Sequence, residues 1–504
     1  IDGIDYLNLW DEAYRNMGQD EFFGQEEIEK YKTGDPYLYP NVDWTSTIMK
    51  KDTYQTINNL SMNGGTDIIR YYANVGYTEQ SGLWKSDSEN PYNTNINMKR
   101  YNLRSNIDVN VTKNLLFEFG LGGVIQQGNY PARSAVDIFD ALRKTPPIAF
   151  PVTNPDGTPA GVTQFLGSNP WGMVTQSGYL VQARNSVQGT FATKWDLSEV
   201  LLQGLSLNGR FAYDHNYSSD VRRQKNFEVK QYLGKDLVTN EDMYSAILRE
   251  ATPLGYTSGN GANRAYYSEF ILNYSRSFGS HDVSGMMMYN QRDYTDLTAG
   301  TSINNLPFRR QGVASRLTYA FLNRYLLEFN AGYNGSENFP REKRFGFFPS
   351  VSAGWVLSNE KFWGTDNAIN HLKLRGSYGK VGNDEIGGRR FLYLTYMNAQ
   401  DAQSYRFGDN MQSMAGIDEA QTGNPDVSWE VSQKSNLGLD LEMFNSKVVM
   451  QVDAFWEDRN EILLQRQQIP FVTGIYPWVI PYANLGKVNN KGIDGMLEVK
   501  NRTA

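Results

Sequence analysis

The ten residues from 102 to 111 read NLRSNIDVNV, and they decide the fold class of the chain. Side chains such as Leu103 and Ile107 take one set of alternate positions, while polar side chains such as Arg104 and Asp108 take the other. Because successive side chains of a β-strand point to opposite faces, this pattern predicts a strand between two different environments. A slip by one residue would exchange the two faces, so the pattern also sets the register.

The same alternation recurs along the chain, in pairs of segments joined by short turns. The expected strand pairs are 53–62/67–78, 98–111/114–127, 184–196/203–217, 265–277/281–296, 308–321/324–337, 346–357/371–381 and 430–441/446–458, and a last strand begins near residue 484. These make about fifteen strands. Most exceed the five or six residues usual in globular proteins and meet the roughly 9–11 that a tilted membrane strand needs.

The connections between these strands are of two kinds. Turns within pairs are mostly short, whereas connections between pairs are often long, near 79–97, 128–183, 218–264, 382–429 and 459–483. Short turns on one rim and long loops on the other are typical of outer-membrane β-barrels. Aromatic residues expected at strand ends fit the interfacial girdles of such barrels. They are Tyr71, Tyr72, Tyr101, Trp195, Tyr325, Trp355, Tyr378 and Trp456. A large soluble β-sandwich or a propeller is the alternative, but the repeat of about 40 residues that a propeller needs is absent.

Composition narrows the function classes. The 504 residues carry a net charge of −7, which argues against a nucleic-acid partner. The chain has no cysteine and three histidines, none of them paired at metal-ligand spacing, so we expect no metal centre and no cofactor. No run of 18 apolar residues is present, so the sequence predicts no transmembrane helix. A β-barrel is the class of membrane protein that this criterion does not exclude.

The first 52 residues differ from the rest of the chain. Apolar residues step by three or four along 4–17, which predicts a helix, and a second short helix is expected over 26–32. We expect 1–52 to be an extracellular loop segment with short helices, and 53–504 to hold the barrel strands and their loops. An odd strand number leaves a sheet edge that hydrocarbon does not tolerate, so we expect the sequence to be part of a larger barrel.

Several short motifs occur in a fixed order along almost the whole chain. They are YYANVGY (71–77), YNLRSN (101–106), RFGFFPSVSAGW (344–355), LKLRGSYG (372–379), NPDVSWE (424–430) and NLGKVNNKGID (484–494). The ordered set resembles the SusC/RagA class of TonB-dependent outer-membrane transporters.

This resemblance implies an antiparallel transmembrane β-barrel of 22 strands, of which about fifteen lie here, with an N-terminal plug and last strands outside this sequence. It further implies a SusD-like surface lipoprotein that acts as a lid, and contact with outer-membrane lipid. Transport would be driven by TonB, with ExbB and ExbD, acting through the plug. The expected location is the outer membrane of a Gram-negative bacterium. The expected activity is import of glycans or, in some members, peptides. The resemblance implies no enzymatic activity.

Candidate cargo contacts are aromatic residues in the long loops, with polar neighbours that suit hydroxyl groups. They are Tyr92, Tyr130, Arg133, Trp171, Tyr179, Tyr405, Tyr476 and Trp478, with Asn169 and Asn424 as further hydrogen-bonding neighbours. Loop packing, or contact with the lid, is the alternative role for each of them. Three cationic residues on the polar face, Arg104, Lys373 and Arg375, are expected to face the lumen and pair with plug carboxylates.

Two other function classes stay open at this point. An adhesive or structural barrel would use the long loops as its binding surface and would need no plug. A barrel hydrolase would need a site such as Asp214 and His215 with Ser218 or Ser219, but nothing in the sequence fixes its geometry.

Overall fold

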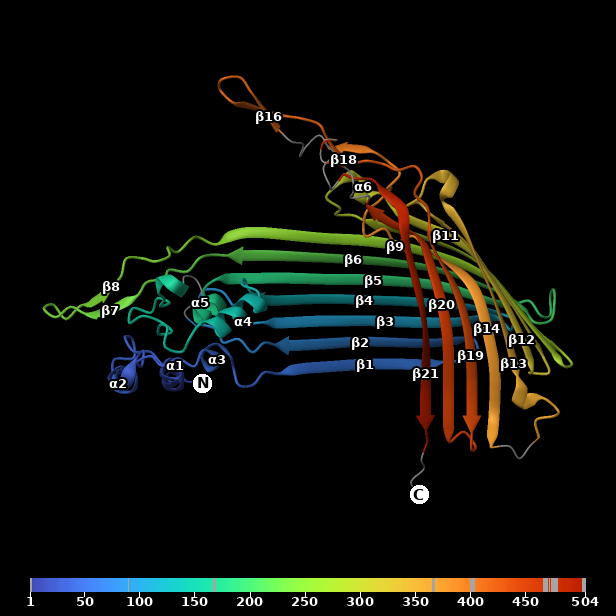
Figure 1. The fold of residues 1–504 in the computed structure, drawn as a ribbon, viewed down its shortest axis with the longest axis horizontal. Helices are drawn as coiled ribbons and strands as arrows, with labels where there is room; N and C mark the ends of the chain where they lie inside the picture. Colours follow the sequence, from blue (N-terminus) through green and yellow to red (C-terminus); the bar gives the residue numbers. More distant parts are fainter. Residues whose placement is uncertain are drawn as a thin grey trace.

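The computed structural model describes residues 2–88, 90–165, 169–364, 368–398, 404–465, 470, 472 and 479–500. One continuous, curved antiparallel sheet dominates it (Figure 1). The sheet has fifteen strands, and each strand pairs with its neighbours along the chain apart from small hairpins in the loops. The predicted all-β, antiparallel architecture is therefore confirmed.

The strand bounds agree closely with the alternating segments of the sequence. The sheet contains β1 (Gln55–Gly65), β2 (Ile69–Ser81), β3 (Asn97–Thr112), β4 (Leu115–Pro131), β5 (Gly178–Asp196), β6 (Leu205–Gln224), β9 (Gly255–Phe278), β10 (His281–Asp296), β11 (Phe308–Phe321), β12 (Tyr325–Ser336), β13 (Phe345–Val356), β14 (Ile369–Asn383), β19 (Glu430–Met443), β20 (Val448–Gln465) and β21 (Tyr482–Val499). Several strands are longer than expected, and the largest extensions, in β5, β6, β9 and β20, run toward the long loops.

The two faces of the sheet are chemically distinct, as the alternation predicted. In β3 and β4, Leu103 pairs with Gly123 and Ile107 with Phe119, so these residues share one face. Leu103, Ile107 and Phe119 are all exposed there. Arg104 belongs to the opposite, polar face. We call the apolar face the outer face and the polar face the inner face.

Helices and small hairpins occupy the connections. The helices are α1 (Gly3–Asn16), α2 (Gly24–Thr33), α3 (Trp44–Ile48), α4 (Ala135–Lys144), α5 (Pro170–Thr175) and α6 (Ser302–Asn305). The hairpins are β7 (Tyr232–Lys235) with β8 (Asp242–Tyr244), β15 (Tyr396–Asn398) with β18 (Asp418–Gln421), and β16 (Ser404–Phe407) with β17 (Gln412–Ala415). Single 3-10 turns lie at Thr163–Phe165, Arg341–Lys343 and Leu357–Asn359. In the described ranges, no helix has the length and apolarity to cross a bilayer.

The helices are set by local signals. The two expected near the N-terminus, 4–17 and 26–32, are confirmed as α1 and α2. Helix α4 was not expected, although Ser134 and Asp137 form a capping box at its start. Helix α5 begins after Asn169, whose side chain accepts from the Gly172 amide, with proline at the first helical position.

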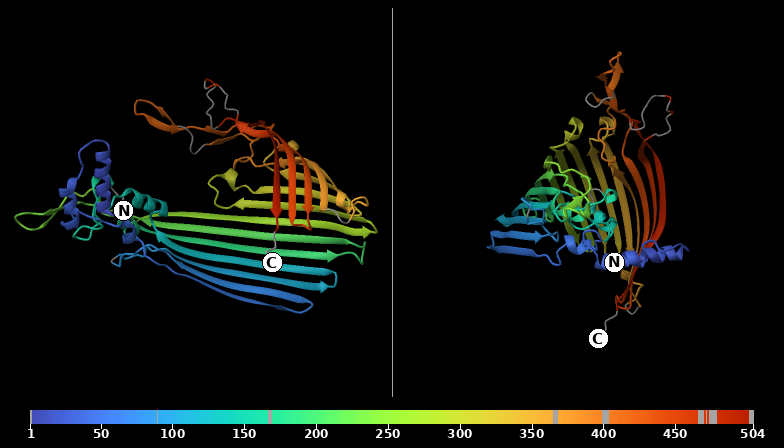
Figure 2. Two further views of the ribbon diagram at one scale, coloured as in Figure 1. Left: turned by 60° about the horizontal axis from the view of Figure 1, so that its bottom comes forward. Right: turned by 90° about the vertical axis from the view of Figure 1, so that its left-hand side faces the viewer.

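All of α1 to α5 lie at one end of the sheet, beside the long connections (Figures 1 and 2). Apolar side chains of α3, α4 and α5 pack into a first loop core that joins the N-terminal segment to the β2–β3, β4–β5 and β6–β9 connections. It consists of Ile48, Trp84, Ile138, Ala141, Met173, Val174, Phe227 and Val229. A second loop core of Phe339, Ile386, Leu392 and Val427 fixes the long connection between β14 and β19. The long loops are thus packed structures with apolar interiors.

The opposite ends of the strands, where the short turns lie, carry aromatic rings. We call this end of the sheet the short-turn rim. The rings of Tyr325 and Trp355 stack with centroids 6.5 Å apart. The Tyr325 hydroxyl (2.7 Å) and the Trp355 indole N–H (3.0 Å) both donate to the Glu360 carboxylate. Tyr71 and Trp195 also lie at strand ends on this rim, whereas Trp456 lies in the interior of β20. The rim therefore carries part of the predicted aromatic girdle.

Candidate functional site: the inner face and the loop cores

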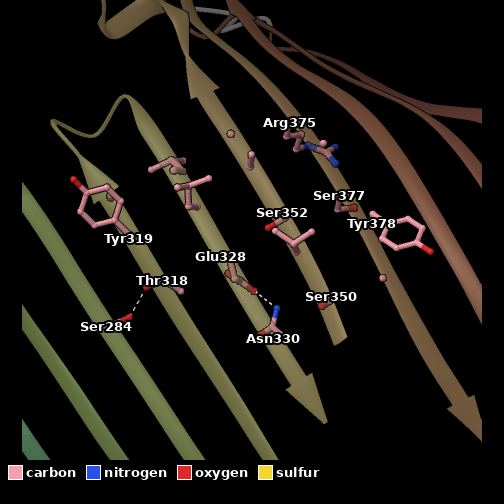
Figure 3. Close-up of a pocket in the computed structure, with 18 of the residues that line it drawn as sticks. Ser284, Thr318, Tyr319, Glu328, Asn330, Ser350, Ser352, Arg375, Ser377 and Tyr378 are labelled. Carbon is pink, nitrogen blue, oxygen red and sulfur yellow. Dashed lines mark hydrogen bonds between the residues drawn. The ribbon is translucent and has the colours of Figure 1, made fainter. Parts of the chain in front are cut away.

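The inner face of β9 to β14 and β19 forms a hollow of about 960 Å³. Figure 3 shows hydroxyl, amide and charged side chains projecting into it. The Ser284 and Thr318 hydroxyls bond at 2.5 Å across β10 and β11. On β12, Asn330 donates to Glu328 at 2.8 Å. Further hydroxyl groups come from Ser350, Ser352 and Ser377. The hollow thus offers many neutral hydrogen-bonding groups, a lining that suits a polar, multiply hydroxylated ligand.

An ion-pair network borders this hollow on β14, β19 and β20. Arg375 donates to both oxygens of Asp453, at 2.6 and 2.5 Å, and to Asp440 at 3.1 Å. Lys373 lies 4.0 Å from Asp440. The two residues expected to receive plug carboxylates are therefore on the inner face, but both already have carboxylate neighbours in the wall.

Arg104 is placed differently. It lines a second inner hollow of about 920 Å³, between β2 and β10, together with Arg70, Asp108 and Glu118. Within the described part of the chain, no ion pair of the Arg104 side chain is found. Pairing with a plug carboxylate stays a prediction for all three cations, and Arg104 is the one whose charge the wall does not balance.

Two of the expected cargo contacts meet at the loop end of the sheet. The rings of Tyr92 and Tyr179 lie with centroids 5.5 Å apart, and the Tyr92 hydroxyl donates to the Gln176 carbonyl at 3.1 Å. Burial raises the pKa of Tyr92. Tyr130 pairs with Leu180, so Tyr130 and Tyr179 point to opposite faces of the sheet. The predicted aromatics therefore do not line one common pocket.

The other expected contacts are spread over the loops. Trp171 is half-buried and packs against the first loop core. Tyr405 lies on the projecting β16–β17 hairpin and is 68% exposed. Tyr476 and Trp478 lie outside the described residues.

The polar neighbours have internal partners. Asn169 is buried and donates to the Val152 and Ala160 carbonyls, and Asn424 donates to the Tyr482 carbonyl at 2.7 Å. Both amides thus tie loops together. Arg133 lies close enough to Arg249 that its charge, after burial, helps lower the pKa of Arg249 to about 10.

The hydrolase arrangement is not formed. On β6, Asp214 pairs with Gln188 and the next residue, His215, pairs with Val187, so their side chains point to opposite faces. The Ser218 hydroxyl donates to the Gly261 carbonyl instead. In the described residues there is also no group of three or more potential metal ligands.

Sequence reasoning missed several polar residues that line the hollow of the inner face or border it. The hydroxyls of Ser284, Ser352 and Ser377 were not singled out, and neither were Asp440 and Asp453. The alternation carries the signal for all of them, because each stands at a polar-face position. Pairing the strands in register, with Gly438 opposite Asp453, would have placed both carboxylates beside Arg375.

An antiparallel sheet of consecutive long strands, with an apolar outer face, a polar inner face, one short-turn rim and one long-loop rim, defines the class of outer-membrane β-barrel proteins. Residues 129–500 match the family model described as TonB dependent receptor-like, beta-barrel. The chain belongs to this family. Its members are receptors and transporters of the Gram-negative outer membrane, not enzymes.

Named relatives agree with this assignment. TonB-dependent receptor P26 of Formosa agariphila is 25% identical over 492 residues, covering 93% of this chain and 45% of the relative. TonB-dependent receptor SusC of Bacteroides thetaiotaomicron is 24% identical over 501 residues, covering 91% and 46%. The chain thus spans about half the length of the curated relatives it matches.

Solved structures show the same fold. The RagAB peptide importer in its open-open state superposes with a TM-score of 0.68 at 19% identity, covering 99% of this chain and 55% of that chain. The closed-closed state gives a TM-score of 0.67. The resemblance to the SusC/RagA class is confirmed.

Proposed function

We propose that the intact protein imports oligosaccharides across the outer membrane, driven by TonB with ExbB and ExbD through a plug domain, with a SusD-like lipoprotein as its lid. The hydroxyl- and amide-lined hollow of the inner face carries this proposal. The hydroxyl and amide groups of this lining can exchange hydrogen bonds with a neutral sugar chain, while the charges of Glu328 and Arg375 are balanced by Arg316 and Asp453 in the wall. We also propose that residues 1–52 belong to an extracellular connection of the barrel.

Peptide import is the second candidate. The structural neighbour RagAB is named a peptide importer. The charged part of the inner face, with Arg375, Asp440 and Glu328, offers partners for peptide termini and side chains. An adhesive barrel stays a third possibility, and it would need neither plug nor lid.

The test is gentle detergent extraction of the intact protein from its native membrane, followed by mass spectrometry of all that co-purifies. A stoichiometric lipoprotein with a bound glycan supports the proposal, and a bound peptide favours the second candidate. A barrel that elutes alone, with no plug sequence among its own peptides, would contradict import.

The inner face can be tested in the same preparation. Replacing Ser352 and Ser377 together by alanine removes two hydroxyl groups from the hollow of Figure 3. Each lost hydrogen bond costs about 1 kcal/mol, so oligosaccharide affinity should fall by about 30-fold. Ser446 on the short-turn rim is the matched control, and its alanine variant should bind normally. Equal affinity of the double variant and the control would count against the hollow as the cargo site.

A further inference from the structure

Cationic residues lie together at the loop end of β4, β5 and β6. Ala132, just beyond β4, donates its amide to the Gly178 carbonyl at 3.1 Å. Lys225, just beyond β6, donates its amide to the Ser177 carbonyl at 3.0 Å. Arg133 follows Ala132, so Arg133 and Lys225 lie at the same end of the sheet, with only β5 between their strands.

Arg249, in the β6–β9 connection, lies near Arg133 and is held in place by its own contacts. Its Nε donates to the Phe227 carbonyl at 3.0 Å, and its guanidinium lies 3.9 Å from the centroid of the Phe227 ring. Its carbonyl accepts from the Val229 amide at 2.9 Å. The charge of Arg133 reaches this guanidinium, because it adds to burial in lowering the pKa of Arg249 to about 10. Two cations so placed repel each other unless an anion balances them.

No carboxylate of the described chain forms an ion pair with Arg133 or Arg249. Arg133 Nε and Arg249 Nη2 are buried, and they have no hydrogen-bond partner among the described residues. Of the carboxylates near them in the sequence, Asp137 caps α4 and Glu228 has a lysine partner 3.7 Å away. Glu250 directly follows Arg249, which lies in an antiparallel bridge, so the two side chains point to opposite sides. Buried donors without a partner cost free energy, which a bound anion recovers.

An aromatic pair lies at the same end of the sheet. Tyr179 follows Gly178, and the centroid of its ring is 5.5 Å from that of Tyr92. Lys225 Nζ lies 6.0 Å from the Tyr92 centroid. An aromatic side chain offers apolar surface to the face of a sugar ring, and a guanidinium group holds a carboxylate or sulfate through parallel hydrogen bonds. Because the chain carries a net charge of −7, this local surplus of cations is not a consequence of its composition.

We propose that Arg133 and Arg249 bind the carboxylate or sulfate group of an acidic residue in the oligosaccharide cargo, beside Lys225 and the Tyr92–Tyr179 pair. Both arginines are partly exposed, so the acidic group can reach them from solvent. This assignment rests on the proposed function and narrows its substrate class to sugar chains with at least one acidic residue. The hollow of Figure 3 then takes the neutral part of the same chain.

The test measures the binding of two sugar probes to the intact protein in mild detergent, by isothermal titration calorimetry. The probes are a galacturonate hexamer and its methyl ester, which keeps the sugar chain but has no charge. The unaltered protein should bind the hexamer about tenfold more tightly than the ester, the factor that corresponds to 1.4 kcal/mol. Arg133→Gln should abolish this difference. The variant should fold, because Arg133 has no hydrogen bond to any other described residue.

The matched control is Arg143→Gln on α4, which removes the same charge from an exposed side chain that pairs with Asp140 at 2.7 Å. It should keep the preference for the hexamer. Equal affinity of the unaltered protein for the two probes, or no binding of either, overturns the acidic-sugar site. The glycan found on the co-purified protein still decides the proposed function in that case.

Two further outcomes would overturn the assignment by giving the arginines another occupant. Tighter binding of a glutamate hexapeptide than of the galacturonate hexamer, lost in Arg133→Gln, would assign them to a peptide cargo. Loss of the co-purified lipoprotein in Arg133→Gln, with the preference for the hexamer unchanged, would mean that a carboxylate of the lid occupies the site.

Discussion

The first loop core should behave as a cooperative unit that can be opened without unfolding the sheet. Phe227 is only 2% exposed, and its ring lies 3.9 Å from the Arg249 guanidinium. Its core also holds side chains from the N-terminal segment and from the β2–β3 and β4–β5 connections. Replacing a buried phenylalanine by alanine costs about 3–5 kcal/mol. The lower end applies here because loops can partly collapse into the space, which leaves about 3 kcal/mol.

Amides of α4 and α5 that exchange through opening of this core should then exchange about a hundredfold faster in Phe227→Ala, since each 1.4 kcal/mol is a factor of ten. Hydrogen exchange with mass spectrometry on the intact protein measures this. Amides of the β3–β6 ladder should keep their rates. The control is Phe362→Ala, because Phe362 is 70% exposed near the short-turn rim. Rates in α4 and α5 that match the control would refute the cooperative core, as would an equal acceleration in the strands.

Three further outcomes follow from single contacts. Arg375→Met leaves Asp453 without its ion-pair partner and Asp440 with only the more distant Lys373, so it should cost about 2 kcal/mol. The loss is seen as a lower temperature at which the folded form disappears in heat-dependent gel mobility. Gly204→Ala should lower the same temperature, because Gly204 has φ +89° and a Cβ there would lie 2.1 Å from a carbonyl oxygen. In the β4–β5 loop, burial alone would raise the pKa of Asp156, but hydrogen bonds, first that from Lys230, hold it below its usual 3.8. Its stabilising effect is thus present above that value and lost as the pH falls through the lower pKa of the folded state, so pepsin cleavage within 151–161 should rise on acidification.

Each of these outcomes has its control. Adding Asp453→Asn to Arg375→Met should restore the lost stability, because the carboxylate left without a cation is then removed. Gly189→Ala should leave the temperature unchanged, because nothing lies within 4 Å of its Cβ. In Asp156→Asn, pepsin should cleave this loop readily already at mildly acidic pH. Further acidification should then add no increase in cleavage that depends on residue 156. Acid-independent cleavage of the unaltered protein would contradict the role given to Asp156.

The strands of this protein can be predicted from the sequence because the two faces of the sheet lie in different environments. Where one face meets lipid and the other meets polar groups, alternation is enforced, and the expected pair 308–321/324–337 agrees with β11 and β12 almost to the residue. Beyond the membrane band that constraint ends. Strand β9 begins at Gly255 instead of near 265, through a Gly-, Ser- and Asn-rich stretch that carries no apolar period.

The candidate site was less predictable, for a different reason. The loop aromatics were chosen by residue type. In the sequence alone, a tryptophan that packs in a loop core, such as Trp171, cannot be told apart from one that contacts cargo. Only the packing of distant segments decides between these roles. The capping box at Ser134 and the Asn169-Pro170 helix start were readable in the sequence and would have found α4 and α5.

The two loop cores can form at different stages of the assembly of the protein. The buried members of the first loop core end at Val229 and its further contacts at Leu248 and Arg249, whereas the second core begins at Phe339. During synthesis or stepwise membrane insertion, the first core can close while most of the later strands are still absent. Its buried members lie between residues 48 and 229, so forming it closes a shorter stretch of chain than contacts across the whole wall, which lowers the entropy lost. The loops of the first half can therefore act as a folding nucleus on which the second half is laid down.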